Sequence, residues 1–167
     1  MLKNLIGISF SVLKYRLLGI RTPIVASIGV TSKCNLKCEY CYAEVDNLNG
    51  KDWPFEDLTK IIDQLHAMGT RVIMLQGGEP LLHTRIDDII NYVKSKNIYC
   101  SITTNSYTFA KHIDAIKKLD QVQLSVDGNR EIMDSYRGEG AYDQAVLAAK
   151  LCDENKIPFH LHSVVTN

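Results

Sequence analysis

Short apolar segments alternate with amphipathic helical segments along most of this chain, and no other feature constrains the fold as strongly. The short segments are rich in apolar and β-branched residues, as buried strands are. Strands and helices that alternate at this spacing predict right-handed βαβ units around a parallel sheet. The predicted strands are Ile24–Val30, Val72–Gln76, Ile98–Thr103, Val122–Val126 and Phe159–Val165.

Four helical segments connect these strands, and in each of them apolar residues lie three or four positions apart. The first has Pro54 at its start and Gly69 just past its end, where these residue types are favoured. In a parallel sheet of this kind ligands bind at the carboxyl ends of the strands, so the residues after each strand are the candidates for chemistry. The predicted helices cover residues 55–68, 86–93, 109–119 and 142–152.

Residues 1–23 differ from the rest in charge and pattern. No acidic residue precedes Glu39, whereas basic residues occur at positions 3, 14, 16, 21, 33 and 37. Apolar residues at helical spacing predict a basic amphipathic helix that packs on the core domain, residues 24–167, or covers one end of it. One alternative is an amphipathic helix in a membrane interface. Another is a signal peptide, although the apolar run leads into further basic residues rather than a cleavage site.

The overall composition is that of an ordinary globular domain. Nineteen basic and nineteen acidic residues give a net charge of zero, and 46% of the residues are hydrophobic. This balance excludes a disordered tail and a nucleic-acid binder held by bulk charge, so we expect no nucleic-acid partner. A chain of 167 residues can bury a core without disulfides.

Three cysteines follow the first strand with the spacing C-x3-C-x2-C, at Cys34, Cys38 and Cys41. A loop gathers such thiols around one point, so a metal is the expected ligand. Structural zinc would need a fourth ligand, for which the candidates are Cys100, Cys152 and His83. An iron–sulfur cluster with three protein ligands would leave one iron open for a substrate or cofactor.

These cysteines, with Tyr40 just before the third, resemble the signature of the radical S-adenosylmethionine (SAM) enzymes. Four further motifs follow in the order in which that family has them. Ser106 stands in one of them where glycine is more usual. The four segments are Gln76–Pro80, which resembles the family's GGEP motif, Thr103–Ser106, Leu124–Gly128 and Arg137–Gly138.

The resemblance implies a six-unit partial TIM-type (βα) barrel of α/β class, of which this chain holds about five strands and four helices plus the N-terminal helix. It implies a [4Fe–4S] cluster on Cys34, Cys38 and Cys41, with SAM on the fourth iron. The other residues assigned to the cofactor are Tyr40, Gly77, Gly78, Glu79, Asn105, Ser125 and Arg137. Glycines let the backbone approach a ligand closely, and the Arg137 fork matches a carboxylate.

Several other residues have weaker claims to a role. Asp127 either faces the substrate or makes a turn with Gly128. His160 and His162 alternate on the last strand and share one side, where we expect two partly buried histidines rather than a pair of ligands. Cys100 and Cys152 lie at apolar positions and are expected to be small core residues.

The family resemblance implies a function. A reduced cluster would cleave SAM to a 5′-deoxyadenosyl radical, which removes hydrogen from a substrate, while the protein orients SAM and excludes water. The motifs resemble the branch of molybdenum-cofactor and peptide-modifying enzymes. Alternatives are a truncated relative that binds a cluster without turnover and a zinc-binding α/β module.

The expected partners follow from this chemistry. They are a small-molecule or peptide substrate and a reductant such as flavodoxin or ferredoxin, and the cysteine usage predicts a cytoplasmic location. The chain ends just after its fifth strand, so we expect an open sheet edge there unless a partner, a second copy or the N-terminal helix covers it. Peripheral membrane contact through that helix is a further expectation.

Overall fold

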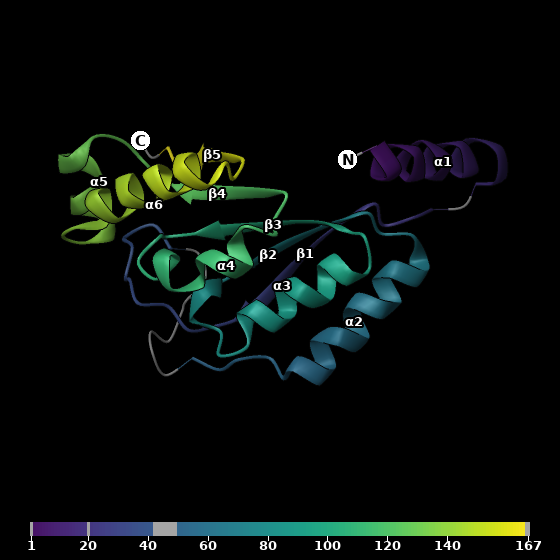
Figure 1. Cartoon of the computed structure of the whole chain (residues 1–167), viewed down its shortest axis with the longest axis horizontal. Coiled ribbons are helices and arrows are strands. Elements are labelled where there is room, and N and C mark those ends of the chain that lie inside the picture. Colours follow the sequence, from purple (N-terminus) through teal and green to yellow (C-terminus); the bar gives the residue numbers. More distant parts are fainter. Residues whose placement is uncertain (1, 20, 42–49, 166–167) are drawn as a thin grey trace.

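The computed structural model describes residues 2–19, 21–41 and 50–165. Its centre is one parallel sheet with the strand order β1-β2-β3-β4-β5 (Figure 1). The order follows the sequence, as expected for successive βαβ units, and the sheet is not closed into a barrel. The α/β partial-barrel prediction is therefore confirmed. The strands are β1 (Val25–Thr31), β2 (Val72–Gly77), β3 (Tyr99–Thr104), β4 (Gln121–Ser125) and β5 (Phe159–His162).

The connecting helices α2, α3 and α4 cover one face of this sheet (Figure 1). The predicted third helix is split into a 3-10 turn and one short α-helical turn. The fourth predicted helix begins after Gly140, whose backbone is left-handed. The elements are α2 (Phe55–Met68), η2 (Pro80–Leu82), α3 (Ile86–Ser95), η3 (Phe109–His112), α4 (Ile113–Ile116) and α6 (Ala141–Asn155).

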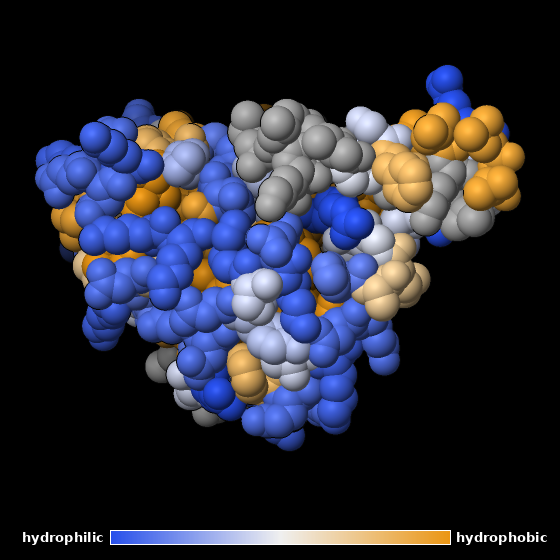
Figure 2. Space-filling model, turned by 45° about the vertical axis from the view of Figure 1, so that its right-hand side comes forward, coloured by the Kyte–Doolittle hydropathy of each residue, from blue (hydrophilic) through white to orange (hydrophobic). Residues whose placement is uncertain are grey.

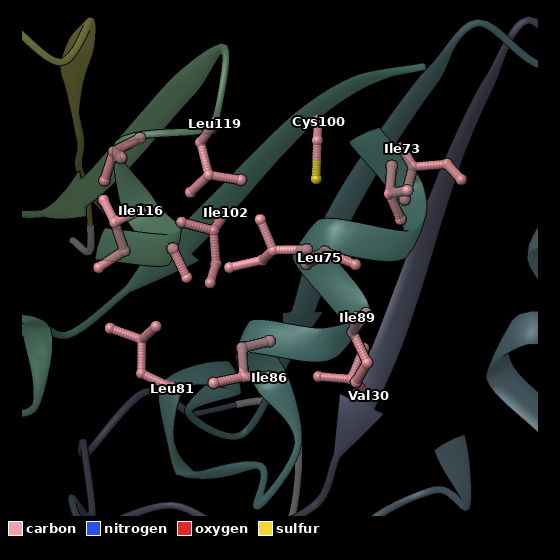
Figure 3. Close-up of a cluster of buried hydrophobic side chains, with 14 of the residues drawn as sticks. Val30, Ile73, Leu75, Leu81, Ile86, Ile89, Cys100, Ile102, Ile116 and Leu119 are labelled. Carbon is pink, nitrogen blue, oxygen red and sulfur yellow. The ribbon is translucent and has the colours of Figure 1, made fainter. Parts of the chain in front are cut away.

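The main hydrophobic core lies between the sheet and these helices (Figure 3). Ile73 and Leu75 of β2 and Ile102 of β3 meet Ile86 and Ile89 of α3, and all five side chains are almost fully buried. Alternate residues of each strand point into this core, which leaves the other set for the opposite face of the sheet. The core therefore fixes which side chains the second face presents.

Two of the five cysteines belong to this core. Cys100 points from β3 among the apolar side chains (Figure 3), and Cys152 lies in the same cluster on α6. Both are fully buried. Their predicted role as small core residues is confirmed.

One helix was missed by the sequence analysis, namely α5 (Arg130–Arg137). The side chain of Asn129 accepts a hydrogen bond from the backbone N–H of Ile132 and so caps the helix. Gly138 ends it with a positive φ of 113°. The helix has only two turns and buries Met133 as its one fully enclosed apolar side chain, so its apolar periodicity is too short to recognise.

The N-terminal helix α1 (Leu2–Leu18) projects from the body near the amino end of β1 (Figure 1). Its described large apolar side chains are not packed on the core as expected, because Leu13 and Leu17 are 50% and 72% exposed. Across the described segments, no helix is long and apolar enough to cross a membrane. The division of the chain at residue 23 stays a prediction.

Strand β5 is an open edge, because within the described residues it pairs only with β4. Leu161 is 57% exposed there. His160 and His162 are also exposed, so the expectation that they are partly buried was wrong. The reason is that β5 has a neighbouring strand on one side alone.

Ser106 gives a direct stability prediction, because it occupies a left-handed position with φ 76°. Its side chain is buried, and its hydroxyl oxygen has no hydrogen-bond partner among the residues that the structure describes. Ser106→Gly should raise the free energy of unfolding by about 1 kcal/mol, since backbone strain and an unpaired buried hydroxyl are removed against the entropy cost of glycine. Urea denaturation measures this. Ser135→Gly, a change inside helix α5, should lower stability instead.

Candidate active site

A cavity of about 240 Å³ opens at the carboxyl ends of the strands. All ten residues that the sequence assigned to the cluster or to SAM line it: Cys34, Cys38, Tyr40, Cys41, Gly77, Gly78, Glu79, Asn105, Ser125 and Arg137. These residues come from segments that are far apart in the sequence. Six lining residues were not assigned: Leu36, Gln76, Thr103, Thr104, His162 and Val164.

The three cysteines lie along the loop after β1 and are all free thiols. Cys34 is buried, Cys38 is half-buried and Cys41 is exposed. Burial raises the pKa of the Cys34 and Cys38 thiols, and the guanidinium of Arg137 offsets part of that rise at Cys38. Metal binding at these positions therefore requires the release of protons.

Gly77 and Gly78 hold this loop against the end of β2. The backbone N–H of Gly78 donates to the Thr31 carbonyl at 2.9 Å, and that of Glu79 donates to the Lys33 carbonyl at 2.7 Å. A Cβ at Gly77 would lie 2.3 Å from the Thr31 oxygen, and one at Gly78 would lie 2.3 Å from the Lys33 oxygen. The glycines are thus required for contact between two backbone segments, and the amides of Gly78 and Glu79 are already used.

Glu79 joins the ends of β2 and β3 from a buried position. Its carboxylate accepts hydrogen bonds from the Thr104 hydroxyl at 2.7 Å, the Asn105 N–H at 2.6 Å and the Leu81 N–H at 3.1 Å. Burial raises the pKa of Glu79 to about 7, although these three hydrogen bonds act in the opposite direction. The residue therefore fixes the turn after β3 beside the cavity.

Asn105 ties the same turn to the cysteine loop. Its side-chain amide donates to the Asn35 side-chain oxygen at 2.9 Å, and its own oxygen accepts from the Tyr107 N–H at 3.2 Å. Asn105 is buried, so these bonds are shielded from water. Its position in the cavity agrees with the assignment to SAM, which stays a prediction.

Arg137 lines the cavity and forms a buried ion pair with Asp127. The Arg137 guanidinium donates to Asp127 through Nε at 2.5 Å and through Nη2 at 3.0 Å. The Tyr40 phenol and the Val164 N–H also donate to the same carboxylate. Burial raises the pKa of Asp127, but these hydrogen bonds outweigh it and hold the pKa below its ordinary range.

Sequence reasoning missed this role of Asp127, since a turn residue and a substrate contact were the only interpretations considered. The fork of Arg137, expected to face a SAM carboxylate, faces Asp127. A contact with SAM would use the remaining Nη1 group, and the assignment of Arg137 to SAM stays a prediction. The sequence does contain a signal for this pair: Asp127 and Arg137 are ten residues apart, and the intervening segment forms helix α5.

Helix α5 also contacts the cysteine loop directly. The Glu39 N–H donates to the Tyr136 carbonyl at 3.1 Å, and the Tyr40 and Tyr136 rings lie 6.1 Å apart. The Arg137 guanidinium lies 5.5 Å from the centre of the Tyr40 ring, within cation–π distance. The missed helix therefore positions one side of the cysteine loop.

The three cysteines all line the same cavity, where a metal group could be held. In residues 2–19, 21–41 and 50–165, no three His, Cys, Asp or Glu side chains converge on a single metal position. A [4Fe–4S] cluster would bind each thiolate to a different iron, which is the arrangement that the family resemblance implies for Cys34, Cys38 and Cys41.

The candidate fourth ligands for zinc are engaged elsewhere. Cys100 and Cys152 are in the hydrophobic core. Both ring nitrogens of His83 have partners, since Nε2 lies 2.9 Å from the Trp53 carbonyl oxygen and Nδ1 accepts from the Arg85 N–H at 3.0 Å. None of the three candidates is therefore placed to be the fourth ligand of a zinc ion on the cysteine loop.

The family assignment rests on a sequence match across most of the domain. The model of the radical SAM superfamily matches residues 28–167. The chain belongs to this superfamily. The cofactors expected from the sequence, a [4Fe–4S] cluster and SAM, are those of the superfamily.

Two curated relatives illustrate the match. Fe-coproporphyrin III synthase of Methanosarcina barkeri is 32% identical over 152 residues, which is 87% of this chain and 37% of that protein. A probable GTP 3',8-cyclase of Methanococcus maripaludis is 39% identical over 104 residues, which is 60% of this chain and 35% of that protein. The chain spans little more than a third of the length of these relatives.

Solved structures support the fold. SuiB of Streptococcus suis, bound to its precursor peptide SuiA, superposes with a TM-score of 0.79 at 22% identity, covering 95% of this chain and 37% of SuiB. Native anSMEcpe, with bound AdoMet and the Kp18Cys peptide, superposes with a TM-score of 0.70 at 27% identity, and the match covers 85% of this chain and 43% of that one.

The contact at Gly78 generates a prediction about the cysteine loop. Gly78→Ala should lower the free energy of unfolding by about 2–3 kcal/mol and reduce iron uptake, because the new methyl group overlaps the Lys33 backbone. Chemical denaturation and iron analysis after anaerobic reconstitution measure the two effects. Gly29→Ala is the matched control, since a Cβ there meets no atom within 4 Å. Equal behaviour of the two variants would contradict the packing role.

The buried ion pair generates a second prediction. Asp127→Asn should lower the free energy of unfolding by ~3–5 kcal/mol, because the guanidinium of Arg137 is left buried without its counter-charge. The exposed bidentate pair of Arg130 and Asp143 is the control, and Asp143→Asn should change stability little. Thermal unfolding of both variants measures the difference. A small effect of Asp127→Asn on stability would show that the ion pair of Asp127 and Arg137 does not stabilise the fold.

Proposed function

We propose that this chain forms the cofactor-binding core of a radical SAM enzyme, with the cluster on Cys34, Cys38 and Cys41 and SAM in the adjoining cavity. The observation that carries the proposal is that one cavity gathers ten residues assigned from separate sequence motifs. When bound, the cluster and SAM supply a 5′-deoxyadenosyl radical that abstracts hydrogen from a substrate. The protein holds the reactants and keeps water out.

The wall residues support the placement of SAM beside the cysteine loop. Glu79 and Asn105 bring acceptors and an amide to one side of the cavity, while Ser125 and Arg137 bring a hydroxyl and a cation to the other. The ordered partners of Glu79, Asn105 and Arg137 mean that little side-chain freedom is lost on binding. Tyr40 also lines the cavity, and its ring could stack on the adenine base of SAM.

The face of the sheet opposite the core favours a polar substrate. Gln76 and Thr103 line the cavity, and Thr103 donates to the Gln123 side-chain oxygen at 3.0 Å. Ser27 donates in the same way to Gln76 at 2.9 Å. In both glutamines the oxygen is engaged, so the amide N–H groups are directed to other acceptors.

We therefore propose that the substrate is a small molecule or peptide whose carbonyl or hydroxyl oxygens accept hydrogen bonds from this row of polar side chains. His160 pairs with Gln123 in the sheet register and extends the row to the open edge. A peptide is supported by the likeness to anSMEcpe, which was solved with a peptide bound. An extended peptide main chain has regularly spaced acceptor oxygens, as such a row requires.

The proposed chemistry needs an external electron donor and a reducing environment. A small reductant such as flavodoxin or ferredoxin would supply the electron. The five free cysteines agree with a cytoplasmic location, where thiols stay reduced.

Cys38→Ala tests the proposed function. Anaerobically reconstituted protein should contain iron and sulfide, show a visible charge-transfer band and release 5′-deoxyadenosine from SAM with dithionite. The variant should lose the release of 5′-deoxyadenosine by at least ~100-fold, since ligand mutations remove the site on which it depends. Cys100→Ala, a change of a core thiol, should keep the cluster.

Three outcomes would count against the proposal. SAM cleavage by Cys38→Ala at the level of the unaltered protein would remove the cysteine assignment. Zinc without sulfide in anaerobically purified protein would favour a zinc module. A cluster that forms but never cleaves SAM would identify an inert relative.

A further inference from the structure

Helix α1 carries two different apolar sides. Val12 and Tyr15 line a hollow of about 200 Å³ together with Arg21, Thr22 and Ile24, and they are themselves 44% and 55% exposed. Gly7 also lies close to the body, since a Cβ there would lie 2.5 Å from Nε of Arg71. These contacts account for the attachment of the helix to the domain.

The second apolar side faces away from the body. Phe10, Leu13 and Leu17 lie at positions i, i+3 and i+7, which places them on one helix face. Their exposed fractions are 57%, 50% and 72%. Figure 2 shows apolar residues gathered on the projecting end of the molecule. An exposed apolar stripe of this size on a helix marks an interaction surface.

The charge around this stripe indicates what covers it. Residues 1–24 contain four basic residues, Lys3, Lys14, Arg16 and Arg21, and no acidic residue. Arg16 and Arg21 are exposed, and in the part of the chain that the structure describes neither forms an ion pair. A second copy of α1 would bring the same positive charge to the contact, which opposes self-association. The stripe and its charge together fit a negatively charged apolar surface.

We propose that α1 binds the surface of a membrane that contains anionic lipids. The stripe of Phe10, Leu13 and Leu17 enters the boundary of the acyl chains, and the neighbouring basic side chains meet the headgroups. The helix joins the sheet at the amino end of β1, whereas the cavity lies at the carboxyl ends of the strands (Figure 1). Membrane binding through α1 therefore leaves the cavity open. The proposal does not depend on the chemistry of the cavity.

Co-sedimentation with phospholipid vesicles tests this proposal on the whole chain. Vesicles of about one-third phosphatidylglycerol in phosphatidylcholine should bind the protein, and vesicles of phosphatidylcholine alone should bind it at least tenfold more weakly. Raising the salt concentration from ~0.05 M to ~0.5 M should release much of the bound protein, since exposed charges are screened.

Two double variants give a matched comparison. Leu13→Glu with Leu17→Glu should weaken vesicle binding at least tenfold, because each leucine contributes about that factor on burial. Ile132→Glu with Leu147→Glu makes the same change of charge at exposed positions on α5 and α6, and should keep binding within about twofold. Because all four positions are exposed, circular dichroism should show both proteins folded. Should the variant with Leu13→Glu and Leu17→Glu misfold, Arg16→Glu with Arg21→Glu gives an independent test of the charge requirement.

Four results would overturn the proposal. Equal binding to neutral and anionic vesicles would remove the lipid charge from the argument, and no binding to either would remove the membrane. Binding that survives the α1 variants would place the contact elsewhere. A dimer of the unaltered protein that the α1 variants dissociate, measured by analytical ultracentrifugation without vesicles, would identify a second copy as the occupant.

Discussion

The contact between the end of β2 and the cysteine loop is the constraint on which the rest of the site depends. Two consecutive glycines allow the backbones to come so close that N–H groups of one segment donate to carbonyls of the other. This contact sets where Cys34 lies relative to the sheet, because a Cβ at Gly78 would come within 3.1 Å of the Cys34 Cβ. Glu79 is the next residue, and its carboxylate holds the turn after β3 by accepting a hydrogen bond from the Asn105 N–H.

A second support comes from the far side of the cavity, where Asp127 collects donors from three separate parts of the chain. Arg137 arrives on helix α5, Tyr40 on the cysteine loop, and the Val164 N–H on the segment after β5. A buried carboxylate with so many donors is ionised and fixed in place. The cavity is therefore held from both sides before any cofactor binds, which lowers the entropy cost of binding one.

The two faces of the sheet have separate duties. The apolar set of side chains packs under α2, α3 and α6 and supplies stability, whereas the alternate set forms a polar row that ends at the cavity. Helix α1 stands outside this division, because it is attached by one side and leaves Leu13 and Leu17 in solvent. The cavity and helix α1 thus lie at opposite ends of the same sheet (Figure 1).

The sequence by itself determined the parallel α/β architecture and ten of the sixteen residues that line the cavity. Period and spacing are local properties, and parallel strands necessarily bring their carboxyl ends to one edge. The tertiary structure decided how the polar groups of that cavity are paired. The sequence analysis treated Asp127 and Arg137 as unrelated residues, one in a turn and one bound to SAM. In the structure the two-turn helix α5 brings Arg137 back to Asp127, and the two side chains form an ion pair. It also decided that His162 is exposed and that α1 keeps an apolar face in solvent, since burial depends on what packs against a residue.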